Sequence, residues 1–105
     1  MKEISDKTFK AEIIQSKLPV LIEFWASWCL PCKAIDIILK DLENLYDSKV
    51  KIAKLNVDRN RTIPNKLDIT GIPTFMIFEN GKITDTKVGA QSKNSLIEMI
   101  EKVLK

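Results

Sequence analysis

Hydrophobic residues change their spacing several times along the chain, and each change marks a predicted element. Apolar positions at helical spacing predict a short helix from Thr8 to Ser16. Val20–Trp25 is a nearly continuous apolar run, which is typical of a central strand buried on both faces. From about Leu30 to Tyr46 the helical period returns over a longer stretch. Its apolar members are Ile35, Ile38, Leu39, Leu42 and Leu45.

The same alternation of strand and helix continues into the second half of the chain. Val50–Val57 alternates partly and predicts a second strand. Arg59–Leu67 is weakly helical, and Pro64 fits such a helix only near its first turn. Thr74–Glu79 predicts a third strand, after which Asn80-Gly81 is a strong hairpin signal.

The chain is predicted to end with a returning strand and a helix. Lys82–Val88 follows the hairpin as an antiparallel strand, and Ser92 is the expected N-cap of the last helix. The apolar stripe of that helix consists of Leu96, Ile100, Val103 and Leu104. This order of elements predicts a mixed α/β sheet with helices on both faces. The long helix begins directly after the first strong strand, so its N-terminus lies at the carboxyl edge of the sheet, where open α/β folds place their sites.

Length and composition limit the function classes. The 105 residues suit a single domain over residues 1–105, and the 45% hydrophobic content suffices for a core. The net charge is +3 with acids and bases interspersed, so nothing favours a nucleic-acid partner. The chain has no histidine, which excludes Ser-His and Cys-His catalysis and a four-ligand zinc site of Cys and His.

The chain carries no recognisable targeting or membrane segment. Met1–Lys7 lacks the apolar core of a signal peptide, and the stretch from Val20 to Trp28 is too short to span a membrane. We therefore expect a soluble, cytoplasmic protein with no membrane contact. Thiols in that compartment are mostly reduced, which favours redox or metal chemistry for paired cysteines over a structural role.

Cys29 and Cys32 are the only two cysteines, and they lie at the predicted start of the long helix. A helix N-terminus stabilises a thiolate, which predicts Cys29 as the attacking sulfur and Cys32 as the resolving one. Pro31 fits the first helical turn. A structural disulfide is an alternative, but so short a loop stabilises the fold by only about 2 kcal/mol. Metal or cluster binding across a dimer is a second alternative.

Five sequence blocks in order resemble the thioredoxin family and cover nearly the whole chain. They are Phe24–Lys33, Ala53–Asp58, Gly71–Thr74, Phe78–Gly81 and Lys87–Ala90. The resemblance implies the thioredoxin fold, a central five-stranded mixed sheet flanked by four helices. It further implies the strand order 1-3-2-4-5, with the last two strands antiparallel to the rest. The sequence departs from the family pattern at Leu30 (usually glycine), Glu23 (usually aspartate) and Ile37 (often proline).

The resemblance also implies an activity and its partners. A member of this family reduces disulfides in protein substrates, carries no bound cofactor or metal, and is recycled by a thioredoxin reductase, with electrons supplied indirectly by NADPH or another donor. We expect a monomer. In the family, the residues at Leu30 and Pro31 set the redox poise, and proline before the second cysteine favours a reductant. Leu30 is hypothesised to shift the reduction potential and partner preference; neutral drift is the alternative.

Glu23 is an acid inside an apolar strand. Burial raises a carboxyl pKa, so Glu23 is the best candidate for deprotonating Cys32 in a chain without histidine. The alternative places Glu23 on a solvated side of the sheet. Lys54 aligns with a family lysine near the buried acid and would bias its ionisation; without the resemblance it would be a surface lysine.

The resemblance places a substrate groove beside Cys29. Pro73 matches the family's cis-proline, which would turn the backbone of Ile72 toward an extended substrate peptide. The groove is expected to consist of Trp28, Ile72, Pro73, Gly89 and Ala90. Trp28 could instead be a core residue, and Trp25 is expected to pack inside.

Three alternatives use the same sequence features, and two of them belong to other function classes. One is a protein-binding module whose dithiol only sets its binding state. Another is a metal or iron–sulfur carrier that works as a dimer. The third, which shares the same chemistry, is a periplasmic disulfide-handling relative. Such proteins usually carry a signal or anchor and an insertion, and we expect neither in this chain.

Overall fold

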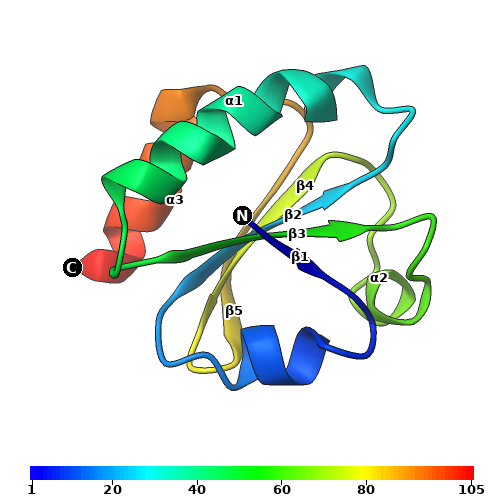
Figure 1. Cartoon of the computed structure of the whole chain (residues 1–105), viewed down its shortest axis with the longest axis horizontal. Helices are drawn as coiled ribbons and strands as arrows, with labels where there is room; N and C mark the ends of the chain where they lie inside the picture. The colour runs from blue at the N-terminus through cyan, green and yellow to red at the C-terminus, as the bar shows by residue number, and fades with distance from the viewer.

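The computed structural model describes all residues from Met1 to Lys105 and contains five strands and four helices around one sheet (Figure 1). The elements are β1 (Lys2–Ile4), η1 (Lys10–Ile14), β2 (Val20–Trp25), α1 (Leu30–Leu45), β3 (Lys51–Asn56), α2 (Thr62–Lys66), β4 (Thr74–Glu79), β5 (Lys82–Val88) and α3 (Lys93–Leu104). Helices α1 and α3 cover one face of the sheet, and η1 and α2 lie at the other (Figure 1). The mixed sheet with helices on both faces is confirmed.

The strand order is β1-β3-β2-β4-β5, as the resemblance implied. β1, β3 and β2 are parallel, whereas β4 is antiparallel to both β2 and β5. The expectation that both of the last two strands oppose the rest is therefore wrong. Only β4 does, because the tight hairpin at Asn80-Gly81 reverses the chain once more and β5 again runs with β2. Both hairpin residues have positive φ, 53° and 79°, as such a turn requires.

The observed elements differ from the expected ones mainly at the N-terminus. β1 pairs with β3 but has only three residues, of which Ile4 alone is buried, so its sequence shows no periodic pattern. The helix expected over Thr8–Ser16 is a single π-type turn, η1, in which Gln15 N donates to the Lys10 carbonyl at 2.9 Å. Helix α2 is likewise shorter than Arg59–Leu67.

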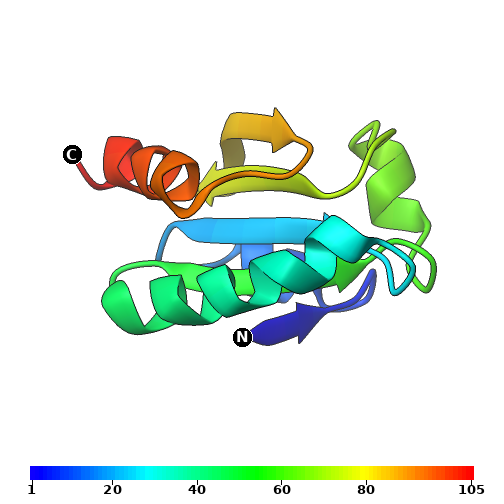
Figure 2. The same ribbon diagram turned by 90° about the horizontal axis from the view of Figure 1, so that it is seen from above.

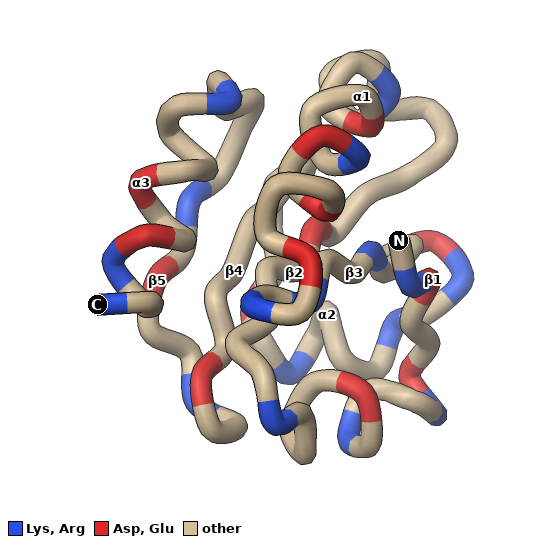
Figure 3. Tube along the Cα trace, turned by 60° about the vertical axis from the view of Figure 1, so that its left-hand side comes forward, with Lys and Arg blue, Asp and Glu red and all other residues tan.

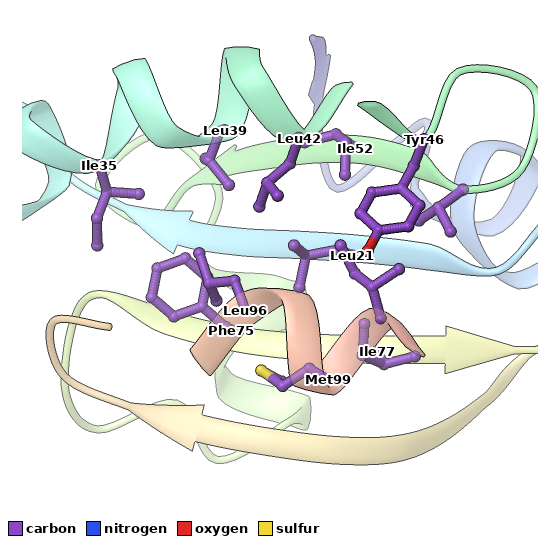
Figure 4. Packing of buried hydrophobic residues seen from close by; sticks show 12 residues of the cluster. Leu21, Ile35, Leu39, Leu42, Tyr46, Ile52, Phe75, Ile77, Leu96 and Met99 are labelled. Carbon is purple, nitrogen blue, oxygen red and sulfur yellow. The ribbon is translucent and has the colours of Figure 1, made fainter. Parts of the chain in front are cut away.

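Two apolar clusters hold the helices on the sheet. The first lies between the sheet and helices α1 and α3, where Leu39 and Leu42 meet Leu21, Phe75 and residues of α3 (Figure 4). The second cluster packs η1 and α2 against the opposite face. Seen from above, α1 lies along β2 and β3, and α3 lies beside β4 and β5 (Figure 2). This packing fixes the N-terminus of α1 at the carboxyl end of β2.

Charged residues are distributed over all sides of the molecule. Lysines, arginines and acids alternate along the trace, in the helices as well as in the loops (Figure 3). None of the helices has both the length and the apolar character needed to cross a membrane. No group of three or more Cys, Asp or Glu side chains is arranged to hold a metal ion.

Candidate active site

The two cysteines lie where β2 passes into α1. Cys29 is the N-cap of α1, and its Sγ accepts a hydrogen bond from the backbone N–H of Cys32 at 3.3 Å. The two sulfurs are joined in a disulfide, with the Cα atoms 5.3 Å apart. Both cysteines are buried, while Leu30 and Pro31 between them are exposed. The backbone N–H of Cys32, in the first turn of α1, thus points toward the Cys29 sulfur, and a helix N-terminus favours a thiolate at this position.

Glu23 lies in β2 and is completely buried. Neither carboxyl oxygen has a hydrogen-bond partner. Burial raises the pKa of Glu23 to about 8; Lys54 opposes this shift, whereas Asp36 and Glu3 add to it. The alternative of a solvated position is therefore wrong. A carboxyl with this pKa exchanges protons near neutral pH.

Lys54 lies beside Glu23, because β2 and β3 pair these two residues in register. Its ammonium nevertheless bonds elsewhere: Nζ donates to Asp36 Oδ1 at 2.6 Å and sits 4.3 Å from the centre of the Trp25 ring. Lys54 is almost fully buried, so it is not an ordinary surface lysine. Sequence reasoning missed Asp36. Acids are common at partly exposed helix positions, and only the structure shows that Lys54 of β3 lies within hydrogen-bond distance of this one.

The position of Trp25 differs from the expected one. It is only half-buried and belongs to neither apolar cluster, although it was expected to pack inside. Its indole Nε1 donates to Glu3 Oε2 at 3.1 Å, so the polar edge of the ring faces outward over β1. A hollow of about 450 Å³ lies beside Trp25, lined also by Asn56 and Arg59, and includes neither cysteine.

The expected groove residues come from three segments at one end of the sheet: Trp28 before α1, Ile72 and the buried Pro73 before β4, and Gly89 and Ala90 after β5. Trp28 is 67% exposed, and its Nε1 donates to Asp58 Oδ2 at 2.9 Å, so Trp28 is not a core residue. The Ile72–Pro73 bond is cis, as the resemblance implied. The Pro73 carbonyl accepts from Gly89 N at 2.8 Å, which joins the end of β5 to the start of β4.

An apolar hollow continues from Trp28 toward Ile72. Its volume is about 300 Å³. Its lining residues are Trp28, Val57, Pro64, Ile69, Thr70, Gly71 and Ile72. Sequence reasoning missed Val57, Pro64 and Ile69, which come from the segment between β3 and β4. Gly89 has φ +95°, a conformation that glycine adopts readily, and Ala90 after it is exposed.

The sequence as a whole matches one known family. A sequence model of the family described as Thioredoxin matches residues 1–102. The chain belongs to the thioredoxin family. A thioredoxin of Rickettsia bellii is 50% identical over 97 residues, which are 92% of each chain. A thioredoxin of Rickettsia felis is 46% identical over 99 residues, 94% of each chain. A thioredoxin of Synechocystis is 41% identical over 102 residues, 97% of this chain and 95% of the relative.

Family membership and the paired cysteines together establish the chemistry. This thioredoxin-family protein is a thiol–disulfide oxidoreductase whose redox-active group is the Cys29–Cys32 disulfide. The family implies disulfide substrates and a thioredoxin reductase as partners. The structure pairs Glu23 with Lys54 below the helix that carries the cysteines. Trp28 and Ile72 line one hollow, and a backbone hydrogen bond joins the buried Pro73 to Gly89.

Proposed function

We propose that this protein reduces disulfides in other proteins, with Cys29 as the attacking sulfur and Cys32 as the resolving one. The observation that carries this assignment is the cap of α1, where Cys29 Sγ accepts the N–H of Cys32. The helix N-terminus favours the charged form of the Cys29 sulfur, and Cys32 lies one turn further into the helix. The residues on either side of Cys29, Trp28 and Leu30, are both exposed.

The reaction has two exchange steps. The Cys29 thiolate attacks one sulfur of the substrate disulfide, forms a mixed disulfide and releases the first substrate thiolate. Cys32 then loses its proton and attacks Cys29 Sγ, which closes the Cys29–Cys32 disulfide and releases the second substrate thiolate. Two electrons pass from the dithiol to the substrate, and the two thiolates leave as thiols once protonated.

Glu23 is the proposed acceptor of the Cys32 proton. Its raised pKa, about 8, allows it to take and return a proton near neutral pH. Lys54 tunes this exchange as the nearest cation, since an ammonium beside a carboxyl lowers the carboxyl pKa. In the return reaction the same carboxyl gives its proton back to Cys32.

The substrate is an extended peptide that lies across Trp28, Ile72, Pro73, Gly89 and Ala90. The backbone N–H and carbonyl of Ile72 take part in no hydrogen bond within the chain, so both are available to a peptide laid beside them. Apolar side chains of the substrate fit the hollow of about 300 Å³ beside Trp28. The hydrogen bond from the Trp28 indole to Asp58 holds the Trp28 side of this hollow in place.

The oxidised protein is recycled by a thioredoxin reductase that returns two electrons and two protons, drawn from NADPH or another donor. No bound cofactor takes part, because the dithiol itself stores both electrons. Pro31 tunes the potential of this couple, and Leu30 tunes its preference among protein substrates. We propose that residues 1–105 act as a single thioredoxin domain and a monomer. A reducing dithiol suits the cytoplasm, where thiols are kept reduced.

Serine substitutions at the two cysteines test this function. In an assay that follows the reduction of a protein disulfide with dithiothreitol as donor, Cys29→Ser lowers the rate to that of dithiothreitol alone. Cys32→Ser retains the first exchange but turns over poorly. A Cys29→Ser variant that keeps the wild-type rate would contradict the proposal, as would a double variant that does so, since the protein would then act without its dithiol.

A further inference from the structure

The acid beneath the active-site helix has a cation beside it that binds another acid. Lys54 is paired in register with Glu23, yet its Nζ bonds Asp36 Oδ1 at 2.6 Å, and Glu23 receives no hydrogen bond. The ring of Trp25 lies 4.3 Å from the same ammonium and adds a second contact that holds it in place. The chain therefore buries a carboxyl without using the adjacent ammonium to satisfy it.

The other charged groups on this face of the sheet do not supply a partner. β1 contributes Glu3, which binds the indole of Trp25. β4 places apolar Phe75 opposite Glu23, and beyond it β5 contributes Lys87, whose Nζ bonds Ser95 of α3 at 3.3 Å. α1 contributes Asp36, while β3 contributes Lys54. Lys54 is thus the one neighbouring cation that the charge state of Glu23 depends on.

Asp36 is placed to control that cation. It follows Cys32 by four residues, so both side chains lie on one face of α1, the face directed at the sheet. The Asp36 carboxylate is partly exposed, whereas Glu23 is enclosed. A buried ammonium is stabilised by the charged acid, and the bond at 2.6 Å has the length of a strong charge-assisted pair.

We propose that Asp36 is a positioning residue that holds Lys54 away from Glu23 and so keeps the Glu23 carboxyl protonated in the oxidised protein at neutral pH. This inference rests on the proposed function, in which Glu23 exchanges a proton with Cys32. Asp36 acts in two ways. Its own negative charge disfavours a second negative charge on Glu23, and its hydrogen bond keeps the Lys54 ammonium from pairing with Glu23, so both effects favour the neutral form of Glu23.

A protonated Glu23 serves the return reaction. A donor thiolate attacks Cys29 Sγ, forms a mixed disulfide with it and breaks the Cys29–Cys32 bond. Cys32 leaves as a thiolate and takes the Glu23 proton, which gives a Cys32 thiol and a Glu23 carboxylate. A second donor thiolate then releases Cys29. Asp36 thus keeps the proton on the acid until the disulfide opens.

The direct test follows the ionisation of Glu23 in the oxidised, full-length protein. The side-chain carboxyl is observed by NMR with ¹³C-labelled glutamate, and Glu23→Gln assigns its signal. Asp36→Ala is expected to lower the titration midpoint of Glu23 by about one pH unit or more. Asp36→Asn, which keeps an acceptor for Lys54 but loses the charge, is expected to lower it less.

Asp41→Ala is the matched control. Asp41 lies on the same helix and also pairs with a lysine, Lys93, at 3.5 Å, but on the exposed side. This variant is expected to leave the Glu23 midpoint unchanged. An Asp36→Ala midpoint equal to that of wild type and of Asp41→Ala would overturn the inference. Should Asp36→Ala fail to fold, Asp36→Asn provides the same test of direction.

A double-mutant cycle shows whether Asp36 acts through Lys54. Lys54→Met alone is expected to raise the Glu23 midpoint. On that background, Asp36→Ala is expected to produce less than half of the shift that it produces in the wild type. A full shift on the Lys54→Met background would show that Asp36 does not work through the lysine, and would overturn the positioning role.

A kinetic readout separates this inference from the proposed function. The pH profile for reduction of the Cys29–Cys32 disulfide by dithiothreitol is expected to move to lower pH in Asp36→Ala, but not in Asp41→Ala. If Cys29→Ser retains disulfide reductase activity, the proposed function fails, whereas the NMR titration still reports on Asp36. If activity depends on Cys29 and the Asp36→Ala profile stays in place, the inference alone fails.

Discussion

Single residues decide the proton chemistry of this site. Some of them can be identified from the sequence, and others cannot. Glu23 is visible in the sequence because an acid interrupts an apolar strand, and the structure places it where that pattern predicts. Asp36 is not visible in the same way. Its contact with Lys54 joins residues 18 positions apart and depends on the register of β3 beneath α1.

Glu23 is predicted to reduce stability as the pH rises. Its pKa is raised from 4.5 to about 8 on folding, so between these values the folded state holds a proton that the unfolded state has lost. The unfolding free energy therefore falls as the pH rises through this window, by at most about 1.4 kcal/mol per pH unit. Below pH 4.5 the carboxyl is neutral in both states, and its effect disappears.

Glu23→Gln replaces the acid by a neutral group of the same shape and tests this account. In urea unfolding of the oxidised protein, its stability relative to wild type should increase by about 2–4 kcal/mol between pH 5 and pH 8. The same variant should turn over substrate more slowly, because Cys32 loses its proton acceptor. A stability difference that stays constant with pH, or wild-type turnover, would count against the role of Glu23.

Leu30 is predicted to act through contact with the substrate. Its side chain is 74% exposed, and Leu30 directly follows Cys29 in the chain. Leu30→Ala removes apolar area that a bound protein would cover, which should lower kcat/KM for a protein disulfide about fivefold, or about 1 kcal/mol. Reduction of a small soluble disulfide should be unaffected.

Leu45→Ala is the control for that measurement. Leu45 is also exposed on α1, but at the end of the helix away from the cysteines. It should leave both rates unchanged. Equal losses with both substrates would indicate a shifted reduction potential instead, and no loss with either would leave Leu30 as a neutral substitution.

At the scale of elements, the spacing of apolar residues predicted those helices and strands that are long enough to repeat the pattern. α1 and α3 were predicted within about one residue, because each presents an apolar stripe to the sheet over three or more turns. β1 could not be found from its pattern, since a three-residue edge strand with one buried side chain carries no period. η1 and α2 are single turns whose ends depend on packing rather than on sequence.

The cap of α3 gives an element-scale prediction. Ser92 Oγ accepts the backbone N–H of Ser95 at 3.1 Å and so satisfies one free donor of the helix. Ser92→Ala should lower the unfolding free energy by about 1 kcal/mol in a urea titration, whereas Ser92→Thr, which keeps a hydroxyl, should lower it less. Equal losses in the two variants would mean that the hydroxyl does not cap the helix.

At the scale of the whole molecule, the fold brings distant segments to one end of the sheet. The cysteines follow β2, Pro73 precedes β4 and Gly89 follows β5, and the Pro73–Gly89 hydrogen bond joins the last two of these segments. Alternating elements predicted the layers and the position of the cysteines. The strand order came from the resemblance. The direction expected for β5 was wrong, although the hairpin predicted at Asn80-Gly81 already required β5 to run opposite to β4.

The central claim is that Cys29 forms the covalent bond to the substrate and Cys32 breaks it. Reacting each single serine variant with one equivalent of a protein disulfide, followed by intact-mass spectrometry, tests it most directly. We predict that Cys32→Ser accumulates a mixed disulfide with the substrate attached at Cys29, and that Cys29→Ser accumulates little under the same conditions. A stable adduct at Cys32 in the Cys29→Ser variant, with none at Cys29 in Cys32→Ser, would contradict the assignment.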